Sequence, residues 1–292
     1  MVTSAAFFLM RQIILTLLTA AAFGRLSAQE LYPYTEPASN MPTGSISTKL
    51  AGMYMRSVHD DKVKQRYVPE VMLGLNRKWM VHGALLFSDM HGERFMMEGA
   101  RAYAKYRFLS NDDVHQHFRM AAFGAATWSR NHLDHNDINL WGDQSGVQGG
   151  IIATQLINRW AFSATADVIQ LLPKERWEKP ATDRYAFQAL QYALSAGVLV
   201  LPRTYTDYRQ TNLNLYLELL GHRNLNFSRE QYYVDLAPAV QLIFNSTGKL
   251  NFGYRFELAS DIYRFSRGQF MVSYEHIFLD AIRHRKKGSM SN

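Results

Sequence analysis

Apolar and polar residues alternate along about twelve segments of this chain. In the clearest segment, every second residue from 250 to 258 is Leu, Phe or Tyr, and the residues between them are Asn251, Gly253, Arg255 and Glu257. Side chains of a β-strand point alternately to its two faces, so this pattern gives one apolar and one polar face. About twelve such strands predict an all-β fold, a closed antiparallel transmembrane β-barrel with lipid outside and a polar lumen inside.

The predicted strands are longer than those of ordinary globular proteins. Most have 11 to 17 residues, whereas a globular strand has about five or six and a tilted strand crossing a bilayer needs about nine to eleven. An even number of strands closes the ring with both chain ends on one side. We predict strands at 45–56, 66–76, 79–89, 94–108, 117–130, 146–157, 159–170, 185–201, 209–221, 231–245, 249–261 and 268–280.

Tight turns and longer polar loops separate these strands. Residues 76–78, 158–159 and 245–248 contain the Asn, Ser and Gly residues of tight turns, whereas 131–144 and 171–184 predict longer loops. Short periplasmic turns and longer outer loops are typical of bacterial outer-membrane barrels. Aromatic residues at strand ends predict girdles at the two membrane interfaces: Tyr67, Trp79, Tyr106, Phe108, Trp128, Trp160 and Phe278.

Proline and glycine interrupt a few of the predicted strands. Pro69 and Pro238 lack the backbone donor of a ladder, so each implies either a bulge or a local error in the predicted register of its strand. The pair Gly149 and Gly150 predicts a bend or a close approach between strands.

The N-terminus predicts export. Residues 13–23 are apolar, follow Arg11 and precede small residues, which is the pattern of a secretory signal. We place cleavage after Ala28, with Gly24 as the alternative. The rest of the sequence contains no run of 18 apolar residues, so no transmembrane helix is expected.

A short leader without alternation separates the signal from the first strand. It contains three prolines, which lower the entropy lost on ordering, and Tyr32, Tyr34 and Met41, which can pack. We predict that it lies against or inside the periplasmic opening, and a disordered terminus is the alternative. The expected parts of the chain are a signal peptide (1–28), the leader or small plug (29–43), the barrel (44–280) and a polar tail (281–292).

Composition excludes several classes of function. The chain contains no Cys, which excludes disulfides and thiolate metal sites. Its formal charge of +7 comes from scattered Lys and Arg residues, and the basic run 283–287 lies in the polar tail, so no nucleic-acid partner is expected. No phosphate loop, nucleophile elbow or zinc-protease motif occurs. We expect no enzyme and no cofactor, and the expected partners are the lipid bilayer of the outer membrane and a small-molecule solute.

Two groups of side chains have the composition of a metal site, but neither is sufficient to predict one. His132, Asp134 and His135 lie in one loop and have ligand types that suit Zn²⁺ or Cu²⁺, but such loops are normally polar and solvated. His115 and His117 have a weaker case, at a turn into a strand. We therefore assign no metal site.

Ser260 and His276 lie on the outward face of the last predicted hairpin, where a serine and a histidine could form a lipid-hydrolase pair. If the hairpin is centred near 264–265, His276 faces Tyr254. That residue is six positions from Ser260, or roughly 20 Å at the usual strand rise. A nucleophile and its base must lie within hydrogen-bond reach, so this pair is excluded.

The start of the mature chain carries a family resemblance. Residues 35–42 read Thr-Glu-Pro-Ala-Ser-Asn-Met-Pro, followed by Ser45-Ile46 and the first strand. This opening resembles that of a group of outer-membrane β-barrel proteins of Bacteroidota, some of them described as transporters. The resemblance implies compartment and fold but supplies no site residues. The architecture is also similar to the fatty-acid and aromatic-hydrocarbon channel superfamily, whose barrels hold an N-terminal plug that is longer than this leader.

The alternation also predicts which charges face the lumen. The inward faces of the first, fourth and fifth strands carry Lys49, Arg101, Lys105, Arg107 and Arg119. Those of the last four carry Glu218, Asp235, Glu257 and Glu275, with only Arg255 opposing them. We expect the two sets to face one another and produce a field across a pore, or else to form ion pairs that fill a plugged barrel.

The leading hypothesis for function is passive transport or binding of a small solute across the outer membrane. It rests on the polar lumen face, which includes Asn212, Asn214, Tyr216, Glu218 and Gln241. The alternative is a structural or assembly component of an outer-membrane complex, without transport.

Overall fold

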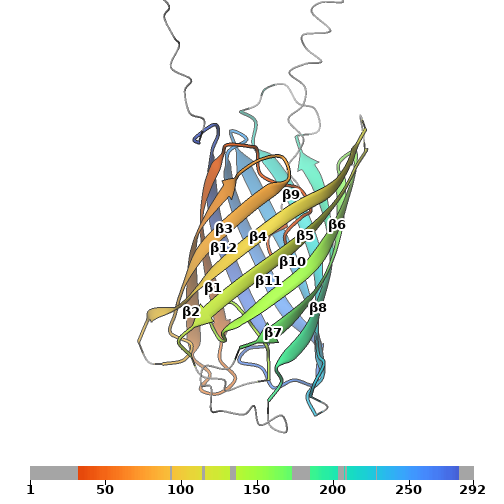
Figure 1. Cartoon of the computed structure of the whole chain (residues 1–292). Helices are drawn as coiled ribbons and strands as arrows, with labels where there is room; N and C mark the ends of the chain where they lie inside the picture. Colours follow the sequence, from red (N-terminus) through yellow and green to blue (C-terminus); the bar gives the residue numbers. More distant parts are fainter. Residues whose placement is uncertain are drawn as a thin grey trace, which may run out of the picture. The chain divides into compact units, whose positions relative to one another are not determined.

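The chain folds into a closed antiparallel β-barrel, and the predicted fold class is confirmed (Figure 1). The computed structural model describes residues 32–92, 94–113, 116–131, 136–172, 185–202, 207, 209–227 and 229–282. Within them, each strand pairs with its neighbours in sequence, and the first strand pairs with the last. The strands are β1 (Ile46–Arg56), β2 (Val63–Gly74), β3 (Trp79–Ser88), β4 (Met96–Asp112), β5 (Gln116–Ser129), β6 (Gly146–Ile157), β7 (Trp160–Leu171), β8 (Gln188–Leu201), β9 (Asn212–Asn224), β10 (Tyr232–Phe244), β11 (Gly248–Ser260) and β12 (Gly268–Phe278).

Some parts of the sequence lie outside the described residues. They include the expected signal peptide, the first residues of the leader up to Leu31, and the basic run 283–287. In the described part of the chain, no helix is long and apolar enough to cross a membrane.

Strand ends differ from the prediction by a few residues. The largest difference is in β4, which continues past Phe108 to Asp112 through a bulge between Arg107 and Leu109. The polar residues from Ser110 onward predicted a loop. They pair with β5 nonetheless, because a ladder of backbone hydrogen bonds does not depend on apolar side chains.

The two ends of the barrel differ in their connections. At the end where β1 starts and β12 finishes, toward the top of Figure 1, the short connections 75–78, 158–159 and 245–247 join the strands. We call this the turn end. Asn158 and Asn245 have positive φ angles of 53° and 50°, which suits Asn in tight turns. The opposite end, which we call the loop end, carries longer connections that include 130–145.

The outer surface of the barrel is apolar. The alternating strip of β11 points outward, and Tyr254 and Leu258 are half exposed. Trp79 and Tyr106 are outward neighbours at the turn end, with ring centroids 4.9 Å apart. A continuous apolar surface of this kind is stable in contact with lipid. The other aromatic residues predicted at strand ends also lie on this outer side: Tyr67, Phe108, Trp128, Trp160 and Phe278.

The inner surface is polar and densely filled. Glu218, Asp235, Gln241 and Lys249 are almost completely buried, although they are polar or charged. The Gln241 amide donates to Asn251 Oδ1 (2.8 Å), and similar bonds join side chains around the wall. Polar side chains of the lumen wall therefore hydrogen-bond to one another.

The prolines interrupt ladders without changing register. The β2–β3 ladder skips Val68 and Pro69 and resumes with the same pairing, and the β10–β11 ladder does the same at Pro238. Neither proline therefore lies at a bulge, so that alternative is wrong. In β10 the bulge lies between Val234 and Asp235 instead.

Gly150 marks a close approach between two strands. A Cβ on Gly150 would lie 2.5 Å from the carbonyl oxygen of Ala166 and 2.8 Å from the Cα of Asp167. Both atoms belong to the backbone of β7 and cannot move alone. Gly150 therefore allows close packing of β6 on β7.

We predict that Gly150→Ala destabilises the barrel by about 1–3 kcal/mol, because the added methyl group meets β7 backbone. The temperature at which the folded band disappears in heat-modifiable gel electrophoresis should fall. Gly83→Ala is the matched control, since its Cβ would meet no atom within 4 Å. Equal transition temperatures for the two variants would contradict the close approach.

Candidate functional site

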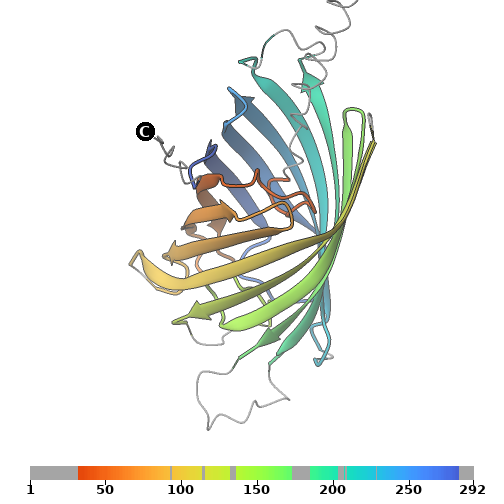
Figure 2. The same cartoon turned by 45° about the horizontal axis from the view of Figure 1, so that its top comes forward.

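The leader lies inside the barrel, where the wall hydrogen-bonds its backbone. In Figure 2 the red chain that precedes β1 runs through the interior. The backbone N–H of Tyr34 donates to Glu218 Oε1 (2.9 Å), and that of Ala38 donates to Thr154 Oγ1 (2.9 Å). Thr35 Oγ1 also donates to Glu218 Oε2 (2.6 Å). The inward-facing Glu218 therefore binds the leader.

Lys105 is the main ionic anchor of the leader. Its ammonium group is fully buried and donates to the carbonyl oxygens of Pro37 (2.7 Å) and Ser39 (2.9 Å) and to Glu36 Oε2 (3.3 Å). Arg119 adds a bond from Nη1 to Ser39 Oγ (2.8 Å). Three donors on one ammonium match these three acceptors.

Apolar contacts also hold the leader against the barrel wall. The Tyr34 ring lies against Gly253 so closely that a Cβ there would be 2.7 Å from it. The Tyr32 ring packs edge-on against Tyr216, with centroids 5.5 Å apart. Ala38 is completely buried in a cluster with Ala121 and Ile152. The leader therefore fills much of the lumen toward the turn end.

At the loop end, the β5–β6 connection folds over the inner wall. Ile138 and Leu140 are buried against Ile169 and Leu171 of β7. The Trp141 ring lies against the guanidinium group of Arg101, 5.0 Å from its carbon atom. We call residues 136–145 the inward loop.

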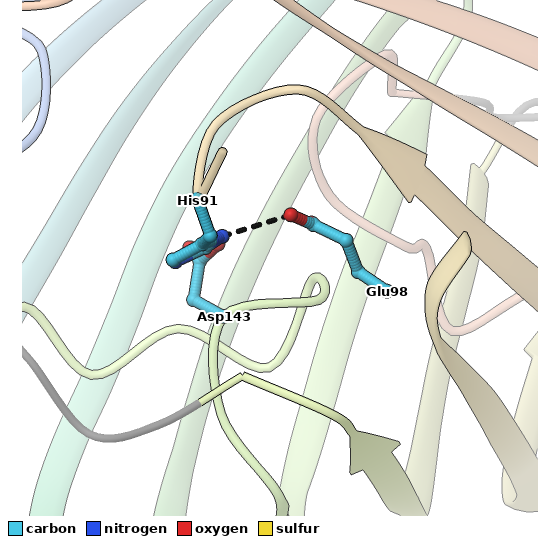
Figure 3. Close-up of side chains that lie close together, drawn as sticks. All are labelled: His91, Glu98 and Asp143. Atoms are coloured by element: carbon cyan, nitrogen blue, oxygen red, sulfur yellow. Dashed lines mark hydrogen bonds and ion pairs between the residues drawn. The ribbon is translucent and has the colours of Figure 1, made fainter. Parts of the chain in front are cut away.

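One rim of the barrel binds the inward loop through Asp143 (Figure 3). The Asp143 carboxylate pairs with Arg66, whose Nη2 is also 3.6 Å from Glu98 Oε2. His91 lies between the two acids, with Nδ1 2.9 Å from Glu98 and Nε2 3.6 Å from Asp143. Asn131 Nδ2 contacts the same ring and donates to the Gly142 carbonyl.

These side chains also have the composition of a metal site. Ligand atoms of His91, Glu98 and Asp143 all lie within 4.8 Å of one another. However, the Arg66 guanidinium pairs with both carboxylates, and His91 pairs with them as well, so these side chains already supply the positive charge that the two acids need. We therefore interpret the group as an ion-pair cluster that fastens the inward loop to β2 and β4.

Arg264, between β11 and β12, fastens the inward loop to another part of the same rim. It makes two bonds to Asp235, from Nη1 (2.7 Å) and Nη2 (2.8 Å), and its Nε lies 3.5 Å from Asp137 of the inward loop. The guanidinium lies over the Tyr233 ring, 3.9 Å from its centroid. Paired, planar contacts of this kind fix an arginine well.

A cavity of about 300 Å³ lies between the leader and the inward loop. Tyr34 and Glu36 line it from the leader, and Asp137 and Trp141 line it from the inward loop. It reaches the loop end at Arg267, whose side chain is 79% exposed. We call this cavity the lumen chamber. Its wall includes Lys49, Glu70, His82, Arg101, Tyr103, Gln148, Asp167, Asp235 and Arg255.

The ten predicted pore-lining residues have different positions and partners. Lys49, Arg101, Asp235 and Arg255 line the lumen chamber. Lys105, Arg119 and Glu218 bind the leader, and Arg107 donates to the Arg77 carbonyl at the turn end. Glu257 lies 3.7 Å from Arg264, and Glu275 lies 3.2 Å from Lys249.

The expectation that only Arg255 opposes the acids of the last strands is wrong. Lys249 is buried on the inner face of β11 and pairs with Glu275, and it lies at the first position of the predicted strand. Asp235 pairs with Arg255 within the same set. On the other side, Lys49 lies 3.8 Å from Glu70 of β2. Opposite charges therefore meet locally, and a transverse field stays a prediction.

Several residues that line the lumen were not predicted from the sequence. Asp167 and Gln148 follow the same inward alternation in β7 and β6, so parity could have identified them. Ile138 and Leu140 are apolar residues within an otherwise polar loop, and this was the available signal for the inward loop. No local pattern indicated Arg264.

Of the histidines considered as metal ligands in the sequence, only His117 lies in the described part of the chain. His132, Asp134, His135 and His115 lie outside the described residues. His117 pairs with Asp112 through Nδ1 (2.9 Å).

The expected register of the last hairpin is wrong. His276 pairs with Gly248 rather than with Tyr254, because β11 extends beyond its partner at the loop end and pairs there with β10. Ser260 is therefore farther from His276 than expected, and the exclusion of that pair stands.

Comparison with known proteins concerns the fold. The sequence matches no protein-family model and no curated protein. The barrel is similar to an outer membrane channel from Pseudomonas putida F1, with a TM-score of 0.60 and 13% identity over 85% of this chain and 100% of that one. It is also similar to the NanC porin, with a TM-score of 0.52 and 8% identity over 78% of this chain and 98% of that one.

We predict that Lys105→Met releases the leader, because the Pro37 and Ser39 carbonyls and Glu36 lose their donor. Cleavage by chymotrypsin after Tyr34 in the folded barrel should accelerate about tenfold, the equivalent of one or two lost hydrogen bonds. Lys64→Met is the matched control, since Lys64 also binds two carbonyl oxygens but at the loop end. Unchanged cleavage would contradict the anchoring role.

The ion-pair cluster predicts a pH dependence. Burial favours the neutral imidazole, but the hydrogen bond to Glu98 and the charge of Asp143 outweigh it and raise the pKa of His91. A raised pKa means that the stabilisation is complete below the ordinary histidine pKa of about 6.5 and is lost as the pH rises through the folded-state value.

His91→Gln should therefore lower the free energy of unfolding of the barrel more at pH 5.5 than at pH 8.5. The difference between the two losses should be at most about 1 kcal/mol. Melting curves of both proteins at the two pH values measure the difference. His276→Gln, on the outer face, controls for loss of a histidine. A larger effect at pH 8.5 would refute the role given to His91.

Proposed function

We propose that this protein resides in the bacterial outer membrane and serves passive transport or binding of a small solute. The observation that carries the proposal is the lumen chamber, a cavity of about 300 Å³ that reaches the loop end and has both charged and aromatic walls. Binding sites for small molecules are concave and combine apolar surface with a few placed polar groups.

Three further features support the membrane location. The outer face is apolar along the strands, the N-terminal sequence is typical of export, and the fold is similar to that of an outer membrane channel and a porin. The resemblance of residues 35–46 to the Bacteroidota group agrees with this location, and membership of that group stays a prediction.

The leader is the control element in this proposal. It forms the floor of the lumen chamber through Tyr34 and Glu36, and Lys105 holds it in place. A solute that enters from the loop end therefore meets the leader before it can reach the turn end. Displacement of the leader would open the path.

A structural role without transport is the second candidate. It is favoured by the filled turn-end half of the lumen, where Lys249 and Glu275 form a buried ion pair and Ala38 is completely buried. A barrel of this size can be filled by its own side chains.

Deletion of residues 32–41 distinguishes the two roles. The barrel ladders do not include these residues, so the variant should fold and show a heat-modifiable band. We expect the rate of liposome swelling in sugars and amino acids to increase at least about tenfold over the full-length protein, because the floor of the chamber is removed. Lys105→Met should give an intermediate rate.

Absence of swelling in the full-length and the deleted protein, for every solute, would reject transport and favour the structural role. Equal, nonzero swelling for both would retain transport and reject the leader as its control element.

A further inference from the structure

We propose that the wall of the lumen chamber binds the zwitterionic head of a small α-amino acid, whose carboxylate pairs with Arg101 and whose ammonium group pairs with Asp167. This inference rests on the proposed solute-binding function and specifies its ligand class. Arg101 is on β4 and Asp167 is on β7, and both line the lumen chamber.

Arg101 is a buried cation with only neutral partners. Nη1 donates to Thr127 Oγ1 (3.2 Å), Nη2 donates to Gln148 Oε1 (2.7 Å), and Trp141 packs against the guanidinium group. No carboxylate oxygen of the described residues lies within 4.0 Å of it. A guanidinium group has five donors, and the ones that face the chamber can serve a ligand.

Asp167 is the acidic counterpart. Its Oδ1 accepts a bond from Gln148 Nε2 (2.7 Å), and the residue is only 6% exposed. Among the described residues, no Lys, Arg or His nitrogen lies within 4.0 Å of this carboxylate. Buried carboxylates are normally paired, so this one is available to a cationic group.

The other charged residues of the chamber wall do have ionic partners in the described structure. Their ion pairs are Lys49–Glu70, Glu36–Lys105, Arg66–Glu98, Arg66–Asp143, Arg264–Asp137, Arg264–Asp235, Arg255–Asp235 and Arg267–Glu257. Arg101 and Asp167 are the exceptions, and they share one neighbour. This contrast marks the pair as a site rather than as part of the structural network.

Gln148 shows how a ligand can use both charges. Its amide oxygen accepts from Arg101 while its amide nitrogen donates to Asp167, each at 2.7 Å. An α-amino acid likewise has acceptor oxygens and a donor nitrogen a short distance apart. A zwitterion beside Gln148 can therefore meet the same two groups in the same order, with stronger charge-assisted bonds.

The opposite charges of Arg101 and Asp167 favour a zwitterion over a simple anion or cation. A simple anion would satisfy Arg101 but be repelled by Asp167, and a simple cation would have the opposite problem. A zwitterion satisfies both. Tyr103 and Trp141 also line the chamber and offer aromatic surface to an amino-acid side chain.

Three probes of equal size class test the inference by isothermal titration calorimetry on the folded, detergent-purified full-length barrel at pH 7. L-Alanine has both charges, N-acetyl-L-alanine lacks the ammonium group, and L-alaninamide lacks the carboxylate. We expect alanine to bind at least about tenfold more tightly than either derivative, because each lost charge-assisted bond removes about one factor of ten. Equal binding of a derivative, or no heat with alanine, would overturn the proposal.

Two variants test which charged group of the ligand each residue binds. Asp167→Asn should weaken alanine binding about tenfold without weakening N-acetyl-L-alanine, and Arg101→Gln should weaken alanine without weakening L-alaninamide. The matched controls are Asp61→Asn and Arg56→Gln, which remove an exposed ion pair at the loop end of β1. Equal loss of alanine binding in a control would also overturn the proposal.

Swelling assays with a sugar separate this inference from the proposed function. Sugar flux without alanine binding rejects the amino-acid subsite and retains transport. Alanine binding without flux of any solute retains the subsite and limits the function to binding.

Discussion

Closure of the backbone ladder is the constraint on which the structure depends. In a bilayer, each strand N–H and C=O must be satisfied within the protein, and a ring without free edges achieves this. The seam between β1 and β12 completes the ring here, with antiparallel pairing from Ile46–Phe278 to Met55–Gln269. Closure also isolates an interior of fixed width, which side chains and inserted chain must fill or leave to water.

The interior is filled by two segments that are not strands. The leader occupies the lumen toward the turn end and is bound by Lys105 and Glu218. The inward loop occupies the loop end and is fastened by Arg66 and Arg264 on different parts of the rim. The lumen chamber is the space that remains. Local ion pairs neutralise most of its charges, which leaves few groups for a ligand.

The strands and the inward face could be predicted from the sequence because both depend on a local, period-two pattern. Lys105 and Glu218 were placed inward by parity alone. Their partners could not be predicted, since the leader has no periodicity and its depth in the lumen depends on its fit to the wall.

The stagger between neighbouring strands also could not be predicted from the sequence. A symmetric hairpin would place His276 opposite Tyr254, whereas it faces Gly248, because β11 extends to pair with β10 after its ladder with β12 has ended. Shear of this kind is a property of the whole ring and not of one hairpin. For the same reason, the approach of Arg101 and Asp167 to a common Gln148 requires the four strands β4 to β7 in register.

The position of the leader in the chain makes it a tethered segment inside the lumen. β1 begins at Ile46, only a few residues after the contacts of Ser39 and Met41 with the wall. A displaced leader therefore stays close to its own binding site, at a high effective concentration that does not depend on the amount of protein in the membrane. Weak contacts are sufficient to keep such a segment bound most of the time. For the transport proposed above, any opening is consequently brief and reversible, and the balance between the open and closed forms is a property of each single molecule.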